Sequence, residues 1–150
     1  MRTQVLASIK IERIPGTSYV RLLEDFLFFS ETLNPSPDSE TWSCIPAGFV
    51  YDEESEWILK GSNPEAGAIH DYYSRSDSGP VVDKATAAAI YQEFQEYFDC
   101  IKQIRCVGLK RFLLRSWHWI KRQFKTGVVE IAPDYFHKHE VMASYEEIAA

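Results

Sequence analysis

The chain lacks any long apolar run. No stretch of its 150 residues approaches the roughly 20 consecutive apolar residues that a membrane-spanning helix needs, and the first residues carry no hydrophobic segment typical of a secretion signal. Internal repeats and low-complexity tracts are also absent, so nothing indicates a repeat architecture. We therefore expect a chain that is made in the cytoplasm of its host cell and spans no membrane.

Cysteine is scarce, and its spacing excludes a zinc motif. Cys44, Cys100 and Cys106 are odd in number and fit none of the usual metal-binding spacings. We expect free, buried thiols in a reducing compartment. The net charge of −6 also argues against a chain that binds nucleic acid over its whole surface.

Aromatic residues, by contrast, are abundant. They make up 14% of the chain, which predicts a core or an interface rich in ring contacts. The hydrophobic share of 45% and the charged share of 25% are those of an ordinary globular domain. A domain of this length buries roughly 70% of its unfolded surface, so it needs neither disulfides nor a structural metal.

The first half of the chain is typical of β-structure. Residues 4–14, 19–29 and 41–50 are rich in β-branched and aromatic side chains, with turn signals at 15–18 and 34–39. The second of these segments predicts one bent strand or two short ones. Pro46 and Gly48 interrupt the third, which predicts an edge strand or a bulge.

The second half is typical of helices. Asn63 and Pro64 predict a helix start, with Asn63 accepting backbone N–H bonds, and this helix is expected to stop near Ser76. Asp83 is expected to open a second helix from Lys84 to about Asp99. A third helix is predicted over 107–125, and a short strand and a short acidic helix over 128–150. Strands followed by helices predict an α+β domain, with a small antiparallel sheet and about three helices over 1–127 and an extension over 128–150.

The pair His70-Asp71 is the leading candidate for chemistry. Adjacent residues on a helix point about 100° apart, so the pair needs a third group, for which Asp52 is the first choice. One interpretation is a structural polar network of Asp52, His70 and Asp71 that joins strand to helix. The other is a reactive site in which Tyr73 and Arg75 are further candidates.

No cofactor is expected under the structural interpretation. Under the reactive one, Asp52, His70 and Asp71 are candidate metal ligands, and their oxygen atoms favour Ca²⁺ or Mg²⁺ over zinc. His137 and His139 have a spacing that places two ligands on one face of a strand, but further ligands are missing nearby.

A basic segment is the last candidate. Half of the 16 basic residues lie between Lys102 and Lys125, a segment without a single acid. Its cations and rings can form a surface for an anionic partner or nucleic acid: Lys110, Arg111, Arg115, Trp119, Lys121 and Arg122. We favour the alternative, an amphipathic helix packed on the sheet, whose solvated cations balance Glu93, Glu96 and Asp99.

Two segments together resemble a known family. They are Ile45-Pro46-Ala47-Gly48-Phe49-Val50-Tyr51-Asp52-Glu53-Glu54-Ser55 and Ala68-Ile69-His70-Asp71-Tyr72. The chain resembles the phage- and prophage-associated domain of unknown function thirteen fifty-three over roughly residues 18–127. That family typically shows Val-Pro-Ala-Gly-Phe-x-Thr-Asp-x-x-Ser, then His-Asp-Tyr-x-Tyr-Arg, then Ala-Asp-x-x-Phe. Departures occur at Tyr51, Trp57, Ser74 and Ala88, whereas Arg75 is kept.

The departure at Ala88 bears on catalysis. In secreted phospholipases A2, which the arrangement resembles by analogy, an acid on a second helix orients the catalytic His. Here that acid is replaced by Ala88, and Asp83 lies more than one helical turn away. An unoriented His is a poor general base.

The resemblance therefore implies a phage- or prophage-encoded, non-catalytic protein. We expect it to be virion-associated or accessory, made in the host cytoplasm, and to bind other phage structural or accessory proteins. The alternative is a hydrolase that uses His70 and Asp71, and a further alternative is anion or nucleic-acid binding through residues 102–125.

Overall fold

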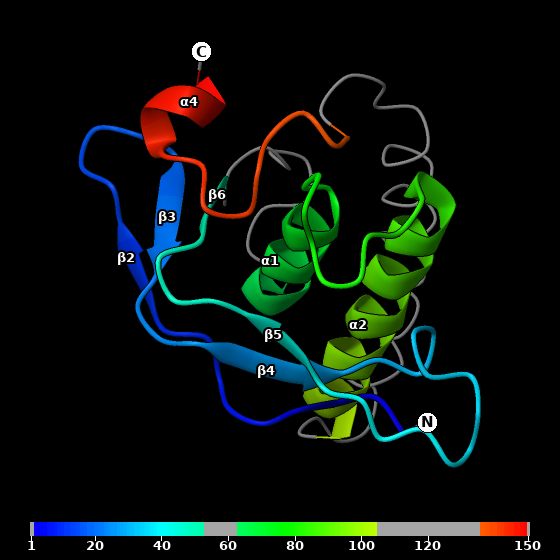
Figure 1. The fold of residues 1–150 in the computed structure, drawn as a ribbon. Coiled ribbons are helices and arrows are strands. Elements are labelled where there is room, and N and C mark those ends of the chain that lie inside the picture. The colour runs from blue at the N-terminus through cyan, green and yellow to red at the C-terminus, as the bar shows by residue number, and fades with distance from the viewer. Residues whose placement is uncertain (1, 53–62, 105–135, 150) are drawn as a thin grey trace.

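The computed structural model describes residues 2–52, 63–104 and 136–149, which form an α+β fold as predicted. These residues contain two antiparallel, three-stranded sheets (Figure 1). Sheet A has β4 (Phe26–Phe29) between β1 (Gln4–Val5) and β5 (Ser43–Ile45). Sheet B has β3 (Tyr19–Leu22) between β2 (Ile11–Arg13) and β6 (Val50–Asp52). The described helices are α1 (Pro64–Tyr73), α2 (Lys84–Ile104) and α4 (Tyr145–Ala149).

Each predicted β segment divides between the two sheets. Residues 4–14 contribute β1 and β2, and residues 19–29 contribute β3 and β4, so the version with two short strands is confirmed. Residues 41–50 divide at Pro46 and Gly48 into two edge strands, as the proline predicted. Gly48 has a φ of +90°, a left-handed conformation that favours glycine, and this lets the chain cross from β5 to β6.

The helices begin where the sequence predicted. Pro64 is in the first turn of α1, and Asp83 Oδ1 accepts a hydrogen bond of 2.7 Å from Thr86 N at the start of α2. The expectation that Asn63 caps α1 is wrong: its side chain makes no capping bond and instead donates 2.6 Å to Gln95 Oε1 on α2. Both side chains are buried, so each needs the other as a partner. The second helix runs on to Ile104, beyond its predicted end.

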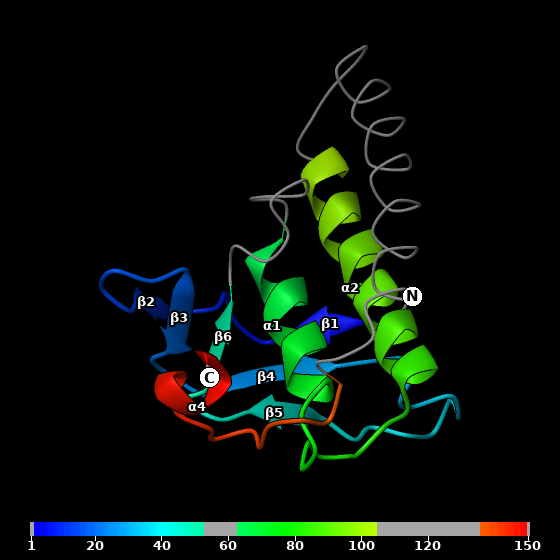
Figure 2. The same ribbon diagram turned by 90° about the horizontal axis from the view of Figure 1, so that it is seen from above.

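The core lies between the helices and the sheets, and it is rich in rings as predicted. The two views show α1 between α2 and β6, with sheet A crossing near the ends of the helices (Figures 1 and 2). Phe28 in β4 is fully buried, and its ring lies 5.3 Å from that of Phe94 and 6.1 Å from that of Tyr73. Edge-to-face contacts of this kind add to the stabilisation from burial itself.

The described end of the chain packs against the domain. His137 N donates 2.7 Å to Ser74 O just beyond α1, and Val141 is buried in the core. The ring of Tyr145 in α4 lies 5.2 Å from that of Tyr19 in β3, which places α4 beside sheet B (Figure 1). The prediction of a short acidic helix near the end is confirmed, with Glu146 and Glu147 in its first turn.

Several predictions concern residues outside the described ranges. The helix predicted over 107–125, its surface residues (Lys110, Arg111, Arg115, Trp119, Lys121 and Arg122) and Cys106 all lie there. Cys44 and Cys100 are free as expected, but neither is buried: Cys44 is half-buried and Cys100 is exposed. Among the described helices, none has the length and apolar character needed to cross a membrane.

Candidate functional site

The last turns of α1 carry the candidate site. His70 Nδ1 lies 3.2 Å from Asp71 Oδ1, and the two side chains are 23% and 28% exposed. The imidazole ring lies 5.1 Å from the ring of Tyr91 on α2. The sequence predicted that the pair needs a third group; in the structure the two side chains turn toward each other across the helix surface and contact directly.

The acid that the family pattern places on α2 is absent, and Asp71 contacts the imidazole. Ala88 is 8% exposed on α2, one turn before Tyr91. Asp83 does not replace the missing acid, because its carboxylate accepts the N–H of Thr86 at the start of α2. When His70 Nδ1 carries the proton, it donates to Asp71, and Nε2 is left to accept one.

Asp52 comes from sheet B, whereas His70 and Asp71 come from α1. Asp52 ends β6, where its backbone pairs with Tyr19 of β3, and its side chain is half-buried. Within the described ranges, no three His, Cys, Asp or Glu side chains are grouped as a metal site requires. Asp52, His70 and Asp71 therefore do not form the metal centre considered above, and Asp52 is not part of the His70–Asp71 ion pair.

Tyr73 links α1 to sheet A. Its side chain is fully buried, and its hydroxyl donates a hydrogen bond of 3.0 Å to Ser43 Oγ in β5. Burial raises the pKa of the Tyr73 phenol well above its ordinary value. A group in this environment stays neutral and acts as a structural hydrogen-bond donor.

Arg75 links the end of α1 to sheet B. Its side chain is 6% exposed, and Nη2 donates 2.9 Å to Val50 O in β6. The guanidinium also lies over the Phe49 ring, 5.4 Å from its centre. Burial lowers the pKa of Arg75, while the nearby negative charge of Asp71 acts in the opposite direction.

The motif at the end of α1 is thus a junction between the two sheets. Tyr73 binds sheet A and Arg75 binds sheet B, through groups that are buried and engaged. Tyr72 adds to the junction, since its hydroxyl accepts a bond of 2.9 Å from Gly79 N in the loop that follows α1. Of the network expected from Asp52, His70 and Asp71, the structure shows the His70–Asp71 contact, whereas the bonds from this motif to the two sheets come from Tyr73 and Arg75.

We predict that Tyr73→Phe costs about 1 kcal/mol of unfolding free energy, the usual net worth of one buried hydrogen bond.

The same variant tests the pKa of the Tyr73 phenol. A pKa raised in the folded state contributes stability that is present below the unfolded value of about 10 and is lost as pH rises above it. Urea unfolding at pH 8 and pH 11 should show a smaller alkaline loss in the variant than in the parent. An equal loss would contradict the assignment.

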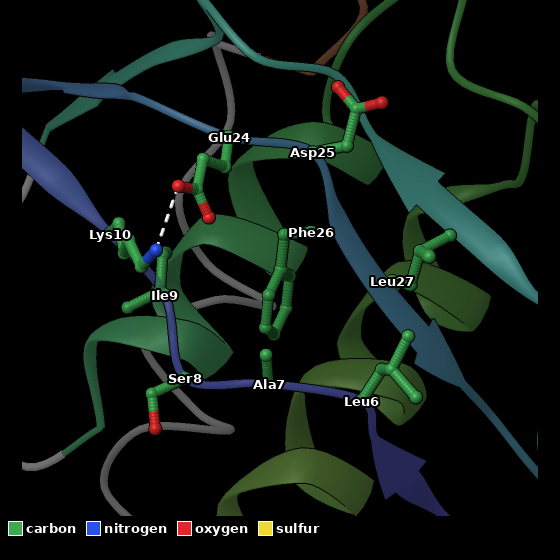
Figure 3. A pocket seen from close by; sticks show the side chains of 9 residues that line it. All are labelled: Leu6, Ala7, Ser8, Ile9, Lys10, Glu24, Asp25, Phe26 and Leu27. Carbon is green, nitrogen blue, oxygen red and sulfur yellow. Dashed lines mark hydrogen bonds and ion pairs between the residues drawn. The ribbon is translucent and has the colours of Figure 1, made fainter.

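The hollow in Figure 3 is lined by none of the motif residues. It is lined by residues 6–10 and 24–27, and an ion pair of 2.7 Å joins Lys10 to Glu24 at its side. Its volume is about 50 Å³, whereas small-molecule sites typically enclose about 300–1,000 Å³. We therefore do not assign a substrate to it.

Sequence reasoning missed two polar assemblies near the start of the chain. Glu93 on α2 was expected only to balance the cations of residues 102–125, but its two carboxylate oxygens accept four hydrogen bonds. The guanidinium of Arg2 is held by backbone carbonyls of residues 34–39. Backbone partners leave no signal in side-chain identity, so only the abundance of polar residues at 30–41 hinted at either assembly.

Comparisons with protein-family models, curated proteins and solved structures find no match to this chain.

Proposed function

We propose that this chain is a small phage- or prophage-encoded interaction protein, non-catalytic, that acts in the virion or as an accessory to it. Its partners would be other phage structural or accessory proteins. What supports the phage origin is the paired motif at residues 45–55 and 68–72, and this part of the proposal rests on the resemblance alone.

One observation carries the non-catalytic part of the proposal. Of the five candidate site residues, Tyr73 and Arg75 are buried and bonded to Ser43 Oγ and Val50 O. Groups in such positions stabilise the fold and are not available to a substrate. Burial of Tyr73 and Arg75 supports a structural role for this end of the motif, while the partly exposed His70 and Asp71 are the residues that distinguish the two candidate functions.

A hydrolase is the second candidate, and the His70–Asp71 contact favours it. At 3.2 Å, Asp71 can hold the imidazole in the tautomer that leaves Nε2 as a base. This role does not depend on the acid that is missing at position 88. The pair is partly exposed on the surface of α1, where a substrate can reach it.

The two candidates predict different results for His70→Ala. A partly exposed pair of this kind contributes little, so we expect a loss of less than about 1 kcal/mol in unfolding free energy. If the protein is non-catalytic, the variant should support particle production as well as the parent does. A folded variant that abolishes hydrolysis of ester or phospholipid substrates by the purified protein would favour the hydrolase instead.

Localisation tests the virion part of the proposal. Particles from a producing culture are separated on a density gradient, and the fractions are probed for this chain. We expect it to sediment with assembled particles, or with their precursors if its role is accessory. Recovery only in the soluble fraction, at every stage of particle assembly, would contradict the proposal.

A further inference from the structure

The Arg2 side chain is enclosed by a set of acceptors that matches a guanidinium group. Nη1 donates to Pro37 O at 3.0 Å and to Ser39 O at 3.3 Å. Nη2 donates to Asn34 O at 2.6 Å and to Ser36 O at 3.0 Å. The four terminal N–H donors of the guanidinium thus each have a carbonyl acceptor.

Two further groups complete the site. The guanidinium carbon lies 5.3 Å from the centre of the Phe29 ring, within the range of a cation–π contact. The remaining donor, Nε, lies 4.0 Å from Glu31 Oε1. We call loop 34–39, with Phe29 and Glu31, the guanidinium cage. A planar cation with donors on two nitrogens fits this cage, whereas an ammonium group cannot reach four diverging carbonyls at once.

The cage is held in shape by bonds that do not involve Arg2. Asn34 is buried, and its Nδ2 donates to Ser30 O at 2.9 Å and to Thr41 O at 3.0 Å. Asn34 Oδ1 accepts the hydroxyl of Ser39, and Ser39 N donates to Ser36 O at 3.1 Å. Because Asn34 fixes both ends of the loop, we expect the carbonyls to stay aimed inward when the guanidinium is withdrawn.

The Arg2 side chain is open to solvent on one side and can leave the cage. The Arg2 side chain is 37% exposed, and two of its four bonds lie at the exposed side of the cage. The next residue, Thr3, is 2% exposed, and its hydroxyl donates to Glu93 Oε1 at 2.7 Å, so the backbone stays in place and only the Arg2 side chain needs to swing out of the cage.

We propose that the guanidinium cage is a binding site for arginine side chains, which Arg2 fills within the chain and which an arginine supplied by a partner fills when Arg2 is withdrawn. The chemistry recognised is the guanidinium group alone. An arginine of another protein and Arg2 of a second copy both supply it.

Rescue of the Arg2→Ala variant tests the proposal. We expect this variant to melt about 4 °C below the parent, and millimolar ethylguanidinium to restore about 3 °C of this in a saturable manner. Ethylammonium at the same concentration should restore nothing. The parent, whose cage is filled, should show no saturable shift with either compound. In Arg2→Lys the lysine should fill the cage only in part, so ethylguanidinium should raise the melting temperature of this variant too.

Two peptides distinguish the sources of arginine. One carries residues 2–6 of this chain, and the other is an unrelated peptide with a single arginine. Binding of both to the Arg2→Ala variant supports a general arginine site, and preference for the first supports exchange between copies. The double variant Arg2→Ala/Asn34→Ala should bind neither. The proposal would be overturned if ethylguanidinium and both peptides gave no saturable response with Arg2→Ala, or if the parent responded equally to them.

Discussion

Replacing Glu93 by Gln is expected to lower the free energy of unfolding by about 4 kcal/mol, from two charge-assisted hydrogen bonds lost at roughly 2 kcal/mol each. In the parent, Oε1 accepts from Thr3 Oγ1 and Glu31 N, both at 2.7 Å. Oε2 accepts from Ser30 Oγ at 2.8 Å and Thr32 N at 3.0 Å. The amide of Gln keeps one acceptor oxygen but replaces the other with an NH₂ group. Because this NH₂ group is itself a donor, two of the four donors around residue 93 are left without an acceptor.

Glu24→Gln is the matched control for this prediction. Glu24 pairs with Lys10 at 2.7 Å, but both side chains are about 60% exposed, so the loss should stay below about 1 kcal/mol. Urea unfolding at neutral pH measures both variants. Equal losses for Glu93→Gln and Glu24→Gln would show that the four bonds at Glu93 do not fix the start of the chain to α2.

Replacing Arg75 by Ala is expected to cost about 4 kcal/mol, because a charge-assisted bond, a cation–π contact and buried packing are lost together. Val50 O loses the donor at 2.9 Å, and the Phe49 ring loses the cation above it. Among the residues that the structure describes, Nε of Arg75 is buried without a hydrogen-bond partner, which is a cost to the parent. We expect Arg75→Met to lose about half as much, since Met refills the volume and removes that cost.

Arg21→Ala is the control for Arg75. Arg21 lies on β3 between the buried residues Val20 and Leu22, but its own side chain is exposed. Its replacement should change the free energy of unfolding by less than about 0.5 kcal/mol. Circular dichroism with urea titration provides the measurement. A loss at Arg75 no larger than at Arg21 would mean that the end of α1 is not held to sheet B through this side chain.

The α+β class was predictable because local chemistry decides it. Pro46 cannot continue a central strand and Gly48 supplies a left-handed turn, so the break between β5 and β6 follows from two residues. Asp83 and Pro64 mark helix starts for equally local reasons. The assignment of each strand to one of two sheets was not predictable, because it depends on pairing between segments far apart in the chain.

The candidate site was predictable in its location but not in the roles of its residues. The motif drew attention to His70 and Asp71, but the buried members of the group are Tyr73 and Arg75. Their partners, Ser43 and Val50, lie 30 and 25 residues earlier, and one of these partners is a backbone carbonyl. The same holds for Asn63. It is a residue type that often caps helices, but its side chain donates a hydrogen bond to a buried glutamine 32 residues later.

The motif at the end of α1 stabilises the junction of the two sheets through Tyr73 and Arg75. The most direct test compares the unfolding free energies, measured by urea titration, of Tyr73→Phe/Arg75→Met and His70→Ala/Asp71→Asn. We predict a loss of about 3 kcal/mol for the first pair and less than about 1 kcal/mol for the second. A larger loss of unfolding free energy for the His70/Asp71 variant than for the Tyr73/Arg75 variant would contradict this role and assign the main structural role to His70 and Asp71.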